Sequence, residues 1–319
     1  MARIICGVDV SSISLEAFVA PNGATGSFHN TVEGITALLE FCQQQQQVEL
    51  VAMEATGGYE KKAVQMLWAE GVGVAVLNPR GVREFAKSLG LLEKTDRIDA
   101  QVIARFAEVK KCEPSVPASA EQQCLKALSR RLQQLSRLAA DQKNQRHLVD
   151  EPRVLRTFDV VLKVAKQQMR EVEAEIAALL ASDPLWQKLE EALRSIKGVA
   201  GRTVARVLAD LPEIGTLSNK AVSKLAGVAP LAQDSGKREG KRAVRGGRRN
   251  VRAILYVVAG VVRRYNPDFA AFAERMAAKG KPKRVIRVAL AHKLLVRLNA
   301  RAREARAAFN CARPVAQNA

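Results

Sequence analysis

The sequence has few of the residues that build zinc sites or disulfide frameworks, and it lacks the long apolar runs that span a membrane. Its five cysteines are scattered without a CxxC pair, and three histidines add little to them, which argues against zinc and against disulfides. No stretch approaches the roughly 18 uninterrupted apolar residues of a membrane span, and the first ten residues are too polar for a signal peptide. We therefore expect a cytoplasmic protein with no membrane association.

The composition is that of a globular protein with an unusually basic C-terminal half. The 319 residues are 48% apolar, which is enough for about two domains with a sizeable core. The net charge of +19 is uneven: residues 1–110 carry −3, whereas residues 235–319 carry +18. This excess predicts a polyanionic partner. Because aromatic residues make up only 4%, stacking of bases on aromatic rows is not the expected mode of binding.

The acidic N-terminal part alternates between strand and helix patterns. Residues 4–10 and 15–20 are predicted as paired strands, and residues 50–54 and 72–77 as further strands. Helical spacing of apolar residues follows at 31–47 and again at 60–70. Paired strands followed by strands that alternate with helices predict a mixed α/β fold.

Four carboxylates in this part have positions that suggest a common site. Asp9 and Glu54 lie at the ends of two predicted strands, while Asp96 and Asp99 are three residues apart, on one face of a helix beginning there. Clustered carboxylates repel each other unless a hard cation neutralises them, so the four acids predict a divalent metal site suited to Mg²⁺. The alternative is that the helical acids cap the helix and that the strand acids are ordinary loop residues.

The middle of the chain carries long apolar heptads. After a Pro-rich linker, leucines and small residues recur from position 125 to 139, and a second series extends from 155 to 179. The spacing predicts a coiled coil or a long helical hairpin that serves assembly. An internal helical bundle is the alternative, because heptads do not say whether the seam closes within one chain or between two.

The basic C-terminal part contains two features that suggest phosphate chemistry. Residues 193–212 resemble a helix-hairpin-helix, whose second helix can hold a phosphate at its first backbone N–H groups. Ser235 lies in a glycine-rich loop, where surrounding cations could assist its attack on a phosphodiester and Asp234 is one possible proton acceptor. A turn-forming serine is the alternative. The candidate nucleic-acid-binding residues are Lys237, Arg238, Arg245, Arg248, Arg249 and Arg252.

The motifs together resemble a known family, the transposases of the insertion-sequence 110 family, whose relatives include pilin-gene inverting recombinases. The N-terminal matches are Gly7-Val-Asp9, Glu54-Ala-Thr-Gly-Gly-Tyr59, Asn78-Pro79 and Lys94-Thr-Asp-Arg-Ile-Asp-Ala100. The C-terminal matches are Gly227-Val-Ala-Pro230, Asp234-Ser-Gly236 and Gly246-Gly247-x-x-x-Val-Arg252. The matches follow one another in the family's order at both ends of the chain.

The resemblance implies a RuvC-like, RNase H-type domain over 1–112, a coiled-coil region over 113–184 and a helical transposase domain over 185–319. Asp9, Glu54, Asp96 and Asp99 match the family's DEDD tetrad, which holds Mg²⁺, and Ser235 matches the nucleophile that forms a phosphoserine link to DNA. It further implies donor and target DNA, a structured non-coding bridge RNA that pairs with both, and dimers that assemble into tetramers. A metal-dependent junction nuclease and a non-catalytic nucleic-acid scaffold are the alternatives.

Overall fold

The computed structural model describes residues 3–45, 48–91, 96–232, 234–235, 240 and 242–312, without the side chains of 96–98 and 312. The described residues form two compact units, Met1–Ala118 and Ser119–Ala319, which we call the N-terminal and the C-terminal unit. Among the helices of the described ranges, none is both long and apolar enough to cross a membrane.

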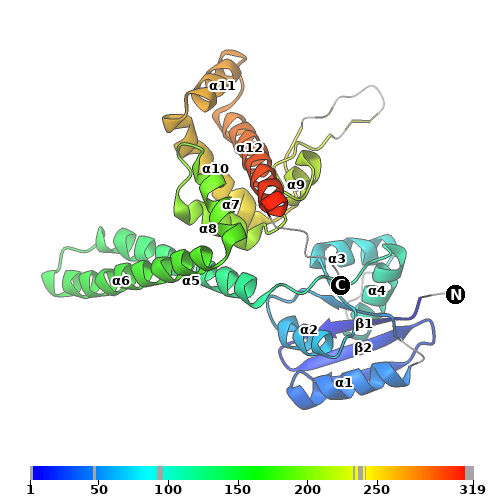
Figure 1. Ribbon diagram of the computed structural model, residues 1–319. Coiled ribbons are helices and arrows are strands. Elements are labelled where there is room, and N and C mark those ends of the chain that lie inside the picture. The colour runs from blue at the N-terminus through cyan, green and yellow to red at the C-terminus, as the bar shows by residue number, and fades with distance from the viewer. Residues whose placement is uncertain are drawn as a thin grey trace. The chain divides into compact units, whose positions relative to one another are not determined.

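The N-terminal unit is built on a mixed sheet, as the sequence predicts (Figure 1). Its described strands are arranged in the order β3-β2-β1-β4-β5. β1 pairs antiparallel with β2 and parallel with β4, and β4 pairs parallel with β5. The strands are β1 (Ile5–Val10), β2 (Ser14–Ala20), β3 (Thr25–His29), β4 (Leu50–Glu54) and β5 (Val74–Leu77).

Helices cover both faces of this sheet because the central strands are apolar on both sides. One apolar layer joins the sheet to α1 and α2, and the other joins it to α3 and α4. The polar strand β3 lies at the edge, with alternate residues exposed. The helices are α1 (Val32–Gln44), α2 (Glu60–Ala69), α3 (Pro79–Ser88) and α4 (Asp96–Val109).

Helix α4 lies unusually close to β1, at a position where the strand has a glycine. A Cβ atom added to Gly7 would lie 2.2 Å from the carbonyl oxygen of Ala100 and 2.5 Å from the backbone nitrogen of Ala104. Any side chain at position 7 would therefore push the helix away from the sheet. The close approach fixes the start of α4, which carries two of the predicted acids, against the strand that carries Asp9.

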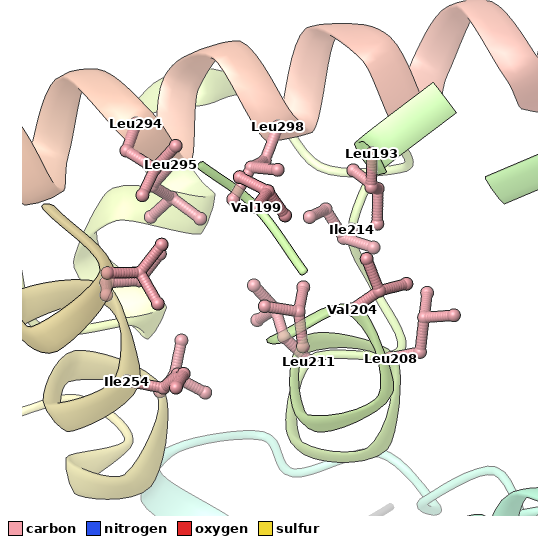
Figure 2. Packing of buried hydrophobic residues seen from close by; sticks show 14 of the residues in the cluster. Leu193, Val199, Val204, Leu208, Leu211, Ile214, Ile254, Leu294, Leu295 and Leu298 are labelled. Carbon is pink, nitrogen blue, oxygen red and sulfur yellow. The ribbon is translucent and has the colours of Figure 1, made fainter. Parts of the chain in front are cut away.

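The C-terminal unit is helical, and its helices share one core. Leu193 of α7, Val204 and Leu208 of α8, Ile254 of α10 and Leu298 of α12 are among the residues that meet there, as Figure 2 shows. The helices are α5 (Ala120–Arg146), α6 (Pro152–Ser182), α7 (Pro184–Arg194), α8 (Gly201–Asp210), α9 (Asn219–Leu225), α10 (Arg249–Tyr265), α11 (Pro267–Ala278) and α12 (Lys283–Ala312).

The predicted heptads form the long antiparallel pair α5 and α6 (Figure 1). At one end of this pair, Leu132, Leu135 and Ile176 pack into the same core as the helices that follow them. Further along the pair, the smaller cluster of Ala139, Leu162 and Ala165 holds the two helices together. The heptads therefore close within the chain as a helical hairpin that belongs to the C-terminal unit.

Candidate active site

Two of the predicted acids lie at the ends of neighbouring parallel strands. Asp9 follows Val8 in β1, and Glu54 follows Met53 in β4, and the pairing of Val8 with Met53 brings these strand ends to the same level. Strand alternation places Asp9 on the same face as Gly7, which α4 covers, and Glu54 on the same face as Ala52. Both acids are half-buried.

The other two acids lie in the first turn of α4. The helix begins at Asp96, as predicted, and Asp99 directly precedes Ala100, whose carbonyl oxygen lies over Gly7. The side chain of Asp96 lies outside the described residues. Among the side chains that are described, no three metal-ligating groups lie close enough to hold an ion. The donor set itself consists only of carboxylates, and such oxygen ligands fit a hard divalent cation such as Mg²⁺.

The loop that follows Glu54 is ordered by an acid that sequence reasoning missed. Glu60, buried at the start of α2, accepts hydrogen bonds from the backbone N–H groups of Thr56 and Gly58 at 3.2 and 2.9 Å. Burial raises the pKa of Glu60, but hydrogen bonds from its own backbone N–H and from Gly58 and Thr56 outweigh the burial, and the pKa lies below its ordinary value. Gly57 adopts a φ of 83°, which a side chain would disfavour. The available signal was an acid placed just after a Gly-Gly turn, at a helix start.

Ser235 is exposed in a loop whose two ends are joined at the base. The loop leaves at Leu231 and returns at Ala243, and these two residues pair through N–H to carbonyl hydrogen bonds of 2.8 and 3.4 Å. Lys237 and Arg238, which were predicted to supply cations beside the serine, lie outside the described residues. The structure thus places the hydroxyl at the surface, where a substrate could reach it.

The two glycine motifs on either side of the loop contact each other through their backbones. A Cβ atom on Gly227 would lie 2.3 Å from the carbonyl oxygen of Gly246, and one on Gly247 would lie 2.3 Å from the nitrogen of Gly227. All three glycines have φ values between 65 and 72°. Arg252 donates a 2.7 Å hydrogen bond to the Gly246 carbonyl and so holds the same turn. The spacing of these motifs therefore has a structural cause: both motifs form the base of the serine loop.

The predicted cations differ in what their side chains contact. Arg245 and Arg249 are exposed, with no ion pair to an acid in the described part of the chain. Arg248 donates two hydrogen bonds of 2.6 Å to Glu213 and a third, of 3.0 Å, to the carbonyl oxygen of Asp210. The guanidinium of Arg248 is thus engaged within the protein, and its contact with phosphate stays a prediction.

Asp234 is poorly suited to accept a proton from its neighbour Ser235. Its carboxylate accepts hydrogen bonds from Arg242 at 2.6 Å and from the backbone N–H of Gly240 at 3.0 Å. These bonds, chiefly the one from Arg242, hold the pKa of Asp234 below its ordinary value. A carboxylate that is already stabilised as an anion is a weak base.

Known proteins match both units of the chain. Residues 6–149 match a DEDD family model described as "Transposase", and residues 190–274 match one described as "Transposase IS116/IS110/IS902 family". The "Pilin gene-inverting protein" of Moraxella bovis is 26% identical over 306 residues, which cover 92% of this chain and 94% of the relative. Its counterpart in Moraxella lacunata is equally similar.

A third relative matches a shorter part of the chain. The "Insertion element IS110 uncharacterized 43.6 kDa protein" of Streptomyces coelicolor is 31% identical over 134 residues, which cover 39% of this chain and 32% of the relative. The two family models match one after the other along the chain, and relatives of similar length match along nearly the whole chain. The chain therefore belongs to the insertion-sequence 110 family of transposases.

Proposed function

We propose that this transposase exchanges DNA strands through a covalent link between Ser235 and a DNA phosphate. The observation that carries the proposal is the exposed hydroxyl of Ser235 in a loop whose base is held by two motifs of the family. Attack by the Ser235 Oγ forms a bond to phosphorus, breaks one phosphodiester bond and releases a DNA hydroxyl. The phosphoserine link keeps the energy of the broken phosphodiester bond for rejoining, whereas hydrolysis would lose that energy. The experiment that tests the proposal is recovery of DNA attached to Ser235 after denaturation.

The proposed role of Asp9, Glu54, Asp96 and Asp99 is to hold Mg²⁺. When bound, the ion would neutralise charge on the phosphate oxygens and on the leaving oxygen. The pairing of β1 with β4 and the close contact of α4 with Gly7 support this role, because they bring strand-end and helix-start acids to one face of the sheet. The N-terminal domain is accordingly proposed to be RuvC-like, in agreement with its strand order.

A structured bridge RNA is proposed to choose the DNA sites by pairing with donor and target. The relatives named for pilin gene inversion support an exchange of DNA segments, and the charge of +18 over residues 235–319 supports binding of nucleic acid backbones. Base pairing would then carry the sequence information, as in other RNA-guided proteins. With DNA and RNA as substrates, the proposed place of action is the bacterial cytoplasm, at the nucleoid.

Replacing Arg245 and Arg249 together with alanine should weaken the salt dependence of nucleic acid binding. Each phosphate that a cation neutralises contributes about −0.9 to the slope of log K against log salt concentration on duplex DNA, so the slope should flatten by about 1.8. Binding to a duplex is measured by fluorescence anisotropy between about 50 and 200 mM salt. A change in slope of about 0.9 per phosphate contact is readily resolved over this range.

The matched control for this variant replaces two exposed arginines that already pair with acids. Arg137 lies 3.9 Å from Asp141, and Arg301 lies 3.0 Å from Glu304. Their double alanine variant should keep the slope of the unaltered protein. An equal loss of slope in both double variants would mean that Arg245 and Arg249 form no specific phosphate-binding face.

We propose that α6 also joins two copies of the chain, giving dimers that pair into a tetramer. Val154, Thr157, Val161 and Val164 follow a 3-4-3 spacing beside the buried heptad positions, and the three valines are exposed. An exposed apolar stripe of this kind is typical of a helix that packs against a partner. Two copies could pair these stripes without disturbing the α5–α6 hairpin.

Replacing Val161 and Val164 with lysine should raise the dimer dissociation constant about a hundred-fold, because buried unpaired charges oppose association. Mass photometry and analytical ultracentrifugation would measure the change. Val257→Lys is the control, since Val257 is an exposed valine on α10. A monomeric unaltered protein at micromolar concentration, or a dimer that survives both lysines, would rule out this stripe.

A further inference from the structure

Glu213 and Arg248 form an ion pair at the base of the serine loop. Both carboxylate oxygens of Glu213 accept from Arg248, each at 2.6 Å, in the two-pronged geometry that makes such pairs strong. About a third of each side chain is exposed, so the pair is partly protected from water. Burial raises the pKa of Glu213, yet the hydrogen bonds from Arg248 outweigh it and the pKa lies below its ordinary value. The carboxylate is therefore charged at neutral pH.

The turn that carries Glu213 is fixed to helix α12. The buried Asn299 accepts a 2.8 Å hydrogen bond from the N–H of Gly215 and donates a 3.0 Å hydrogen bond to the carbonyl of Leu217. Arg306 donates to the carbonyl oxygens of Ile214 and Pro212 at 2.8 and 3.0 Å. Glu213 thus extends from a rigid part of the core.

Arg248 stands where the chain returns from the serine loop. It follows the glycine pair that contacts Gly227, and it directly precedes α10. Its backbone N–H donates a 2.7 Å hydrogen bond to the carbonyl oxygen of Leu225, at the end of α9. Its side chain turns to Glu213 instead of solvent. One residue therefore connects the returning arm of the loop to α9 and to the turn held by α12.

We propose that Glu213 is a positioning residue for the serine reaction, which holds the returning arm of the Ser235 loop in place through Arg248. The inference rests on the proposed role of Ser235. Glu213 touches no reacting atom; it acts by keeping the base of the loop at one position on the core. An acid is needed there because Arg248 would otherwise be an unpaired, partly buried cation in a strongly basic segment.

The first test reads the position of the loop without any DNA. Hydrogen–deuterium exchange is measured in the full chain for the backbone N–H groups of Ala243 and Arg248. Glu213→Gln keeps the shape of the side chain but loses its charge, and exchange at these two positions should rise about ten-fold. Glu190→Gln is the matched control, because Glu190 pairs with Arg194 within α7. Unchanged exchange in Glu213→Gln would overturn the inference.

The second test reads the reaction. The probes are duplexes that carry the ends of the element and its target, together with RNA transcribed from the non-coding DNA beside the gene. Glu213→Gln should lower the rate of covalent attachment about ten-fold, with an unchanged dissociation constant for duplex DNA and a melting temperature that stays well above the temperature of the assay. If unfolding of the variant or weaker binding of duplex DNA accounted for the whole loss of rate, the positioning role would be overturned.

The double variant decides whether Glu213 acts through Arg248. If it does, Glu213→Gln combined with Arg248→Gln should be no slower than the more damaging single variant, whereas independent roles would give additive losses. Failure of the serine proposal would be seen separately, as absence of any adduct with the unaltered protein. The exchange measurement would still show whether Glu213 holds the loop.

Discussion

Ser235→Ala should abolish the recovery of DNA covalently bound to the protein. The variant loses only an exposed hydroxyl, so it should fold and should bind guide RNA and duplex DNA as the unaltered protein does. Attack on the phosphodiester, in contrast, has no other nucleophile in the proposed reaction. The measurement is a denaturing gel of end-labelled DNA before and after protease treatment, where a protein-linked strand migrates slowly until it is digested.

Two other serines provide matched controls. Ser218 caps α9 by accepting a 3.2 Å hydrogen bond from the N–H of Ala221, and its replacement should cost about 1 kcal/mol of stability and leave the adduct intact. Ser223 is buried, and its side-chain oxygen has no hydrogen-bond partner within the described structure, so alanine should be tolerated there. An adduct from Ser235→Ala would refute the assignment. Free 3′-hydroxyl and 5′-phosphate ends without an adduct, in the unaltered protein, would favour a metal nuclease.

Asp9→Asn and Glu54→Gln should each lower strand exchange at least about a hundred-fold, because each would remove a ligand of the proposed metal ion. Guide RNA binding should remain, since carboxylates oppose phosphate binding when no metal is present. The gain in melting temperature on adding Mg²⁺ should disappear, and this readout does not depend on activity.

Glu49 is the matched control for Glu54 because it lies beside the other end of β4. It precedes Leu50, the first residue of the strand, and pairs with Arg3 at 3.5 Å on the surface. Glu49→Gln should keep both strand exchange and the response to Mg²⁺. If Asp9→Asn also lost guide RNA binding while folded, or if Mg²⁺ stabilised it as much as the unaltered protein, the acids would not form the metal site.

Patterns along the sequence predicted the parts of the fold that depend on residues close together in the sequence. Alternating or continuous apolar runs correctly indicated β1, β2, β4 and β5, and the heptads indicated the helices α5 and α6. The strand β3 was missed because it is a polar edge strand with little burial. Helices α3 and α11 were also missed, although Asn78-Pro79 and Asn266-Pro267 are cap and first-turn signals.

Sequence patterns did not predict the parts of the candidate site that depend on contacts between residues far apart in the sequence. Motifs indicated Asp9, Glu54 and Ser235, but no local pattern links Glu213 to Arg248, which lie 35 residues apart. The charge of Arg248 alone suggested phosphate binding, and only the fold revealed that an acid already holds it. Likewise, Gly7 is an ordinary strand residue in the sequence, and its role depends on a helix that follows about ninety residues later.

The joined base of the serine loop also limits how far the nucleophile can reach. Leu231 and Ala243 are paired through their backbones, so both ends of the loop start from the same place on the surface. Ser235 lies four residues beyond Leu231, and an extended chain spans at most about 3.5 Å per residue, which gives a radius of about 14 Å. In the proposed reaction, the DNA phosphate would have to come within this radius of the loop base. Any greater distance would have to be closed by movement of the DNA strand toward the protein, because the loop cannot extend further.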